Sequence, residues 1–172
     1  NIQALDLTLA TSSMRKPLLL HQINGDGCNE QTFVPTVSSI EVDKKLRISP
    51  SGGRPSSISA FPFFNLQYGD RGVIVGLGWT GQWAASFERN QAGRTRLRAG
   101  MEQTHLLLRP GEKIRSPRIL LMSWKQDRQA AHNRFRRLIQ FHYVPRQKGR
   151  PLAMPLALQC FDRYVARPGW AT

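Results

Sequence analysis

Cysteine is scarce in this sequence, which has two among its 172 residues, Cys28 and Cys160. Neither belongs to a Cys-x-x-Cys motif or a Cys/His cluster, which excludes a disulfide-rich scaffold and a zinc finger. Isolated thiols of this kind are more often small buried apolar residues, and a single long-range disulfide between them stays open. Long apolar runs are also missing. None approaches the roughly 18 residues of a membrane-spanning helix, so we expect no membrane contact.

Acidic residues are also few, since 11 Asp and Glu stand against 25 Lys and Arg. Glycoside hydrolysis needs two carboxyl groups at a fixed separation, and the scattered acids form no such motif. Glu102 and Glu112 are candidates by position alone. The sequence has no Gly-x-Ser-x-Gly elbow or His-Glu-x-x-His motif, and its four His have no ligand spacing. We therefore expect no catalytic residue, metal site or cofactor, and no enzymatic activity from this chain alone.

The positive charge, a formal +14 at pH 7, is concentrated in one part of the chain. Residues 89–150 contain 16 basic and three acidic residues, whereas the first 88 residues are balanced. Such asymmetry favours a partner of opposite sign, either nucleic acid or an acidic protein domain. No known nucleic-acid-binding motif accompanies it, and Arg rather than Lys suits bidentate pairs with carboxylates. A genome rich in G and C would produce the same Arg excess without functional meaning.

Short apolar segments separated by turn signals such as Asn24-Gly25 and Pro110-Gly111 dominate the chain. Many short, regularly spaced strands with turns between them are typical of a β-sandwich or barrel. We expect one all-β domain over residues 1–172, an antiparallel β-sandwich with one helix. The predicted strands are 2–9, 18–21, 32–40, 46–48, 59–66, 72–77, 83–89, 95–99, 105–108, 118–124 and 156–165.

The predicted helix spans residues 128–143, which contain no Gly or Pro. Its apolar positions recur at helical spacing, and Val144-Pro145 ends it. The apolar side includes Phe135, Leu138 and Ile139. Three arginines cluster on and around the polar side: Arg134, Arg136 and Arg137.

Residues 76–81 match the dinucleotide-binding pattern Gly-x-Gly-x-x-Gly literally. Trp79 is bulky where that motif has a small residue, and the chain continues with a period of two rather than with a helix. We interpret the segment as a turn between two sandwich strands. Trp79 and Trp83 flank this turn with Gln82 between them. Either the pair stacks on sugar rings while Gln82 binds hydroxyl groups, or the rings belong to the core.

Several motifs, taken in order, resemble the N-terminal domain of α-galactosidases of the melibiase type (glycoside hydrolase family 36, clan D-like). They are Gly-Gly-Arg-Pro-Ser at 52–56, Phe-Pro-Phe-Phe-Asn at 61–65, Gly-Trp-Thr-Gly-Gln-Trp at 78–83, Ala-Gly-Met-Glu at 99–102, Leu-Arg-Pro-Gly-Glu at 108–112, Asn-Arg-Phe-Arg-Arg at 133–137 and His-Tyr-Val-Pro at 142–145. The resemblance covers nearly the whole chain.

This resemblance implies a β-supersandwich that precedes a (β/α)₈ barrel, and the barrel carries both catalytic Asp residues. The chain then represents a non-catalytic accessory domain, a fragment without its first strands and without the barrel. It is expected to dock on the barrel, wall one side of the carbohydrate cleft and support oligomer contacts. The start of the sequence has no signal peptide, which favours the bacterial cytoplasm.

Two sets of residues are candidates for function, the second chosen from the charge asymmetry and the helical spacing. The candidates for carbohydrate binding are Trp79, Gln82, Trp83 and Arg54, and the candidates for docking are Arg134, Arg136 and Arg137. The expected partners are the barrel of the same polypeptide and a carbohydrate substrate, and a homo-oligomer stays open. Two alternatives are kept: a free-standing carbohydrate-binding module, and a basic domain that binds nucleic acid.

Overall fold

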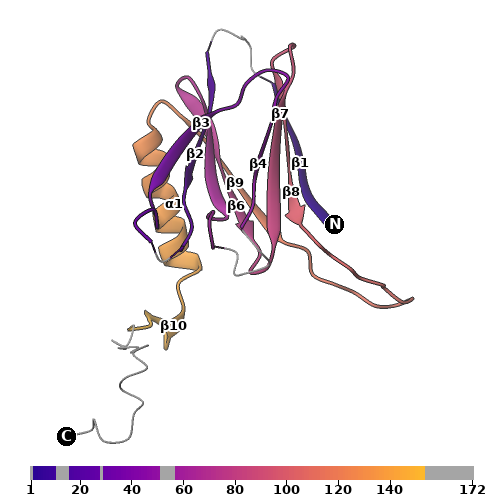
Figure 1. The fold of residues 1–172 in the computed structure, drawn as a ribbon. Helices are drawn as coiled ribbons and strands as arrows, with labels where there is room; N and C mark the ends of the chain where they lie inside the picture. The colour runs from indigo at the N-terminus through magenta and orange to yellow at the C-terminus, as the bar shows by residue number, and fades with distance from the viewer. Residues whose placement is uncertain (1, 11–15, 28, 51–56, 154–172) are drawn as a thin grey trace, which may run out of the picture. The chain divides into compact units, whose positions relative to one another are not determined.

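In a computed structural model of the chain, the structure describes residues 2–10, 16–27, 29–50 and 57–153. The chain divides into two compact units, residues 1–135 and 136–172. The first unit is a sandwich of two antiparallel sheets, visible as separate layers in Figure 1. Among the described residues, no helix is long and apolar enough to cross a membrane.

The first sheet has four strands, in the order β1-β8-β7-β4. The strands are β1 (Ile2–Ala10), β8 (Arg94–Met101), β7 (Trp83–Arg89) and β4 (Lys45–Ile48). Their side chains alternate between the core and the outer face, as a period of two requires. In β7, for example, Trp83, Ala85 and Phe87 are buried, while Ser86 and Glu88 are partly exposed on the other side.

The second sheet has five strands, in the order β3-β2-β5-β6-β9. They are β3 (Pro35–Ser39), β2 (Leu18–Ile23), β5 (Phe63–Tyr68), β6 (Arg71–Gly78) and β9 (Arg118–Lys125). The central strand β6 is buried at consecutive positions, because Val75 faces the other sheet while Ile74 faces the helix. A strand covered on both faces reads as a continuous apolar run.

The core lies between the two sheets and is built from large side chains. Trp83, Phe87 and Leu97 of the four-stranded sheet are completely buried, as are Leu20 and Val75 of the other sheet. The ring of Phe64 meets that of Phe87 edge to face across this layer, with centroids 5.3 Å apart. Edge-to-face contacts of this kind add about 0.5–1.5 kcal/mol to the area that they bury.

Helix α1 (Arg128–His142) begins at a cap, since the Asp127 carboxylate accepts a hydrogen bond from the Ala130 amide at 3.0 Å. Within the first unit, Ala131 and Phe135 of this helix pack on the outer face of the five-stranded sheet beside Trp124. Gly72 makes room for that indole, because a Cβ there would lie 2.6 Å from the Trp124 ring. The second apolar contact of the fold therefore depends on a residue without a side chain.

Polar side chains run through this second contact. Asn65, which is 3% exposed, accepts a hydrogen bond from Trp124 Nε1 at 2.9 Å, and its amide nitrogen lies 2.9 Å from His132 Nε2. Nearby, His21 Nε2 lies 2.7 Å from Gln67 Oε1. Burial lowers the pKa of both histidines, and the positive charge of Arg128 lowers each further. Both rings are therefore held neutral beneath the helix.

The second unit is described as far as residue 153. It contains the end of α1 and a two-stranded hairpin, β10 (Arg146–Gln147) and β11 (Arg150–Pro151). Lys148 and Gly149 turn the hairpin with φ of 50° and 77°, the left-handed pair that two-residue hairpins require.

The predicted fold class and the helix are confirmed, and the helix ends one residue earlier than predicted. The predicted strand at 105–108 is wrong, because these residues lie in an exposed loop between β8 and β9 with no neighbouring strand to pair with. The predicted strand at 59–66 starts later, at Phe63. Three features lie outside the described residues: the predicted strand 156–165, the two cysteines and Arg54.

We expect Asn65→Ala to reduce the free energy of unfolding by about 1–3 kcal/mol, because it leaves the buried Trp124 N–H without its acceptor. Urea titration followed by far-UV circular dichroism measures the change. Asn133→Ala, at an exposed position of α1, is the matched control and should stay within about 0.5 kcal/mol of wild type. Equal midpoints for the two variants would contradict the role of Asn65.

We also expect stability to fall as the pH drops from about 7 to about 5. His21 and His132 have folded pKa values below the usual 6.5, so the unfolded chain takes up protons first and the folded state loses stability below that pH. The urea midpoint should decrease across this range, and the decrease should shrink in the His21→Gln/His132→Gln variant. His105→Gln, which changes an exposed histidine, should leave the wild-type slope intact.

Candidate functional site

The turn that follows β6 separates the two tryptophans predicted to bind sugar. Trp83 is completely buried and packs in the core with Phe87. It presents no ring face to a ligand, so its assignment as a carbohydrate-binding residue is corrected: the alternation of β7 places it inside. Trp79 is half-buried at the edge of that core, and its indole nitrogen would lie 2.9 Å from a Cβ at position 81. Gly81 therefore lets the turn fold against the indole.

Gln82 is the centre of a small polar network at the start of β7. Its amide nitrogen donates to the carbonyl of Pro50 at 3.0 Å and to Glu102 Oε2 at 3.2 Å. The other oxygen of Glu102 accepts a hydrogen bond from Arg47. Pro50 directly precedes the segment that contains Arg54 in the sequence. Gln82 thus ties β7 to the end of β8 and to the approach to the Gly-Gly-Arg-Pro-Ser motif.

An open cavity of about 310 Å³ lies on the outer face of the four-stranded sheet, next to this network. Small residues in the middle of the sheet and long charged side chains line it together: Ala84, Ser86, Gly100, Arg47, Arg98 and Glu102. Gly100 is required by the bulge in β1, because a Cβ there would lie 2.2 Å from the Ile2 carbonyl oxygen. The described lining contains hydrogen-bonding groups that suit sugar hydroxyls or a carboxylate, but no aromatic ring.

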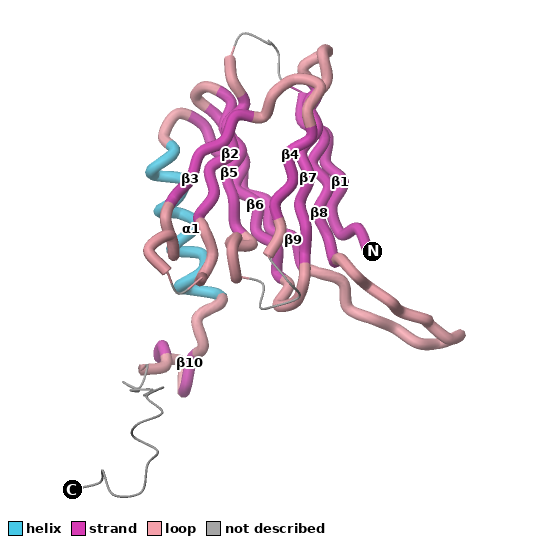
Figure 2. Tube along the Cα trace, in the orientation of Figure 1, coloured by secondary structure: helices cyan, strands magenta, loops and turns pink. Residues whose placement is uncertain are grey.

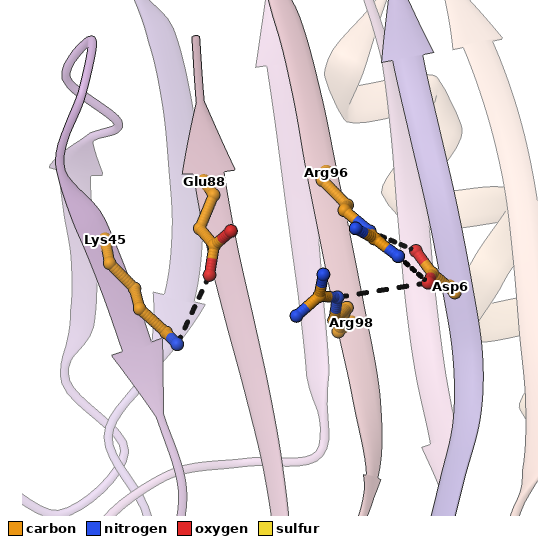
Figure 3. Close-up of polar contacts among 5 residues, drawn as sticks. All are labelled: Asp6, Lys45, Glu88, Arg96 and Arg98. Atoms are coloured by element: carbon orange, nitrogen blue, oxygen red, sulfur yellow. Dashed lines mark hydrogen bonds and ion pairs between the residues drawn. The ribbon is translucent and has the colours of Figure 1, made fainter.

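The same outer face carries pairs of opposite charge across neighbouring strands (Figure 3). Arg96 of β8 binds Asp6 of β1 through two hydrogen bonds of 2.8 and 2.5 Å, and Lys45 of β4 lies 3.2 Å from Glu88 of β7. The hydrogen bond from Arg96 lowers the pKa of Asp6 to about 2. Arg98 approaches the same carboxylate to 3.9 Å. Several positive charges on this face are therefore paired with carboxylates of the same domain.

The three arginines predicted to dock on a partner are all exposed on α1: Arg134, Arg136 and Arg137. None of them takes part in an ion pair among the described residues. In this respect they differ from the arginines of the four-stranded sheet, and their guanidinium groups are available to a carboxylate on another surface.

The two acids considered for chemistry have other contacts. Glu102 pairs with Arg47 and Gln82, whereas Glu112 accepts a hydrogen bond from the Arg109 amide at 2.9 Å and holds a turn. Among the described residues, no three His, Cys, Asp or Glu side chains are grouped as a metal site would need.

Sequence reasoning missed the pair of Asp6 and Arg96 and the network around Gln82. Asp6 and Arg96 are 90 positions apart in the sequence, a separation that no local sequence pattern can connect. The sequence contained a weak signal for the pair. Both residues occupy polar positions in strands whose side chains alternate between polar and apolar, so they would share a face if β1 and β8 were neighbours. The neighbour relation itself is a property of the sheet order.

No family model and no curated protein sequence matches the chain. Solved structures do match. The galactosidase domain of the α-galactosidase-sucrose kinase AgaSK has 17% identity and a TM-score of 0.66, and the match covers 85% of this chain and 20% of that one. The α-galactosidase from Lactobacillus brevis has 19% identity and a TM-score of 0.57, with 70% and 16% covered.

A third similar structure is the family 36 α-galactosidase AgaA from Geobacillus stearothermophilus, an A355E variant of which was solved with 1-deoxygalactonojirimycin. It has 17% identity and a TM-score of 0.61, with 81% of this chain and 20% of that chain covered. The chain thus matches a fifth or less of the length of these proteins. The predicted resemblance is confirmed at the level of the fold: the chain has the β-sandwich fold of a domain found in family 36 α-galactosidases.

Proposed function

We propose that this chain is a non-catalytic accessory domain of an α-galactosidase-type glycoside hydrolase, which docks on the catalytic domain and helps to wall the carbohydrate cleft. The observation that carries the proposal is the partial match: the structural similarity extends over 70–85% of this chain but over 16–20% of each α-galactosidase. In this proposal the remaining length of such an enzyme supplies the chemistry. The substrate class would be α-galactosides, the sugars for which the similar enzymes are named.

The state of the carboxylates supports a non-catalytic role. A retaining or inverting glycosidase needs an acid and a nucleophile or base facing each other across the scissile bond. Asp6, Glu88 and Glu102 each pair with a basic side chain of this domain. Carboxylates paired in this way stabilise the contact between neighbouring strands. A pKa of about 2 for Asp6 also makes it a poor general acid at neutral pH.

A wall for the cleft is best placed at the end of the sandwich that holds Gln82. Trp79 is half-buried there, and Gln82, Glu102 and Arg47 provide hydrogen-bonding groups fixed by their own contacts. Side chains held by neighbouring groups lose little entropy on binding. This end therefore suits contact with a sugar that another domain holds.

The two alternatives find less support. A free-standing carbohydrate-binding module would use exposed aromatic rings, and the burial of Trp83 removes half of the predicted pair. A nucleic-acid binder would present unpaired cations in a continuous stripe. On the four-stranded sheet Arg96 and Lys45 are paired with acids, so the exposed cations of α1 are the ones that remain for this alternative.

The isolated chain should not hydrolyse aryl α-galactosides, because hydrolysis needs a cooperating pair of carboxyl groups and Asp6, Glu88 and Glu102 are each paired with a basic side chain. Release of nitrophenol from the chromogenic substrate measures this, with the wild-type chain beside the Glu102→Gln and Glu112→Gln variants. Turnover that either substitution abolishes would place the chemistry in this domain and overturn the proposal.

Arg134→Ala and Arg137→Ala should weaken binding of this domain to its separately expressed catalytic domain by about 2–5 kcal/mol, the usual cost of stranding one member of a buried ion pair. Isothermal titration calorimetry gives the affinities. Arg71→Ala is the matched control, since Arg71 is exposed and makes one surface pair with Asp70, worth at most about 1 kcal/mol. Affinities that stay unchanged for both helix variants would leave these arginines without a docking role.

A further inference from the structure

The segment between β8 and β9 is a long, fully described connection of the sandwich that lies exposed over most of its length. We define it as the β8–β9 arm, residues 103–117. Every residue from His105 to Ser116 is exposed. Figures 1 and 2 show the arm running away from the two sheets at the end of β8 and returning to β9. The first unit therefore has a projecting element that its own core does not cover.

The arm is held by contacts at its base and by a hydrogen-bonded turn at its tip. At its base, the Glu102 amide donates to the Gln82 carbonyl at 3.2 Å, and Pro117 is buried. At its tip, the Glu112 amide donates to the Arg109 carbonyl at 3.0 Å, and the Glu112 carboxylate accepts from the Arg109 amide at 2.9 Å. Gly111 supplies the φ of +87° that the turn needs. An element held at both ends and at its tip is partly preorganised for a partner.

The sides of the arm are apolar. Three consecutive leucines and one isoleucine are exposed, by 50%, 84%, 47% and 42% of their surface: Leu106, Leu107, Leu108 and Ile114. Burying one such side chain fully stabilises a structure by about 1.5–3 kcal/mol. Single exposed apolar residues are ordinary, but a contiguous group on a projecting element marks an interaction surface.

Positive charge surrounds these apolar residues. Arg109, Lys113 and Arg115 lie on the arm, where the one acid, Glu112, is already engaged in the turn. The chemistry that fits the arm is therefore an apolar groove with carboxylates on its rim.

A second copy of this chain fits poorly. Each copy carries a formal charge of +14, which makes two copies repel each other. Stable association of separate proteins also buries about 1,200 Å² or more, and four side chains on a narrow arm offer little of that. A covalently linked domain needs far less contact, because the linkage supplies a high effective concentration.

We propose that the β8–β9 arm inserts its leucines into an acid-rimmed apolar groove on another domain of the same polypeptide. This inference rests on the proposed function, in which that domain is the catalytic one, and it assigns the docking element and the chemistry of the surface that receives it. The leucines supply the contact and the flanking cations select the acidic rim.

Amide hydrogen exchange tests the proposal by comparing the full-length natural polypeptide with the 172-residue chain. Amides of residues 104–116 should exchange at least about 100-fold more slowly in the full-length protein. Leu107→Asp should abolish that protection, and Lys113→Glu/Arg115→Glu should reduce it. Val37→Asp, which changes an equally apolar residue that is 58% exposed on β3, is the matched control and should leave the arm protected.

Equal exchange of the arm in the two proteins would overturn the inference. Protection of the 172-residue chain by vesicles of phosphatidylserine and phosphatidylcholine, or by raising its own concentration, would overturn it in favour of a membrane or of a second copy. An α-galactosidase assay on the full-length protein keeps the two claims apart. Activity with an unprotected arm would refute the docking element alone, whereas a protected arm in a protein without activity would refute the proposed function.

Discussion

Two antiparallel sheets can share one apolar layer only if every strand directs alternate side chains into it. In this protein β7 meets that requirement with Trp83, Ala85 and Phe87. The same alternation places Glu88 on the outer face, beside Lys45 and opposite Arg96. The buried tryptophan and the charged outer face are thus two results of one constraint, and the site at Gln82 lies where β7 enters the layer.

The five-stranded sheet uses its other face for a second contact, with the start of α1. This contact contains polar groups, and it tolerates them because they bond to one another: Trp124 to Asn65, and Asn65 to His132. Buried polar groups that are satisfied in this way specify one arrangement, whereas any one left alone costs stability. The start of the helix is thereby placed on the sheet by hydrogen bonds as well as by apolar packing.

The large positive charge has two different distributions. On the four-stranded sheet, cations face acids across neighbouring strands, and such pairs support the sheet. On α1 and on the β8–β9 arm, the arginines and lysines have exposed positions, and on the arm they stand beside uncovered leucines. The positive charge is thus paired with acids on one sheet and exposed to solvent on the helix and on the arm.

Local sequence determined the strand alternation of residues 83–89, the continuous run at 72–77 and the helix at 128–142, because each depends on the spacing of neighbouring residues. Tertiary structure decided the rest. Leucines at 106–108 have strand composition but no strand beside them, and a β-strand exists only through hydrogen bonds to a partner distant in sequence. Whether Trp83 faced a ligand or the core, and whether Asp6 met Arg96, likewise depended on which strands became neighbours and which face became the interior. A single sequence contains no local record of those long-range choices.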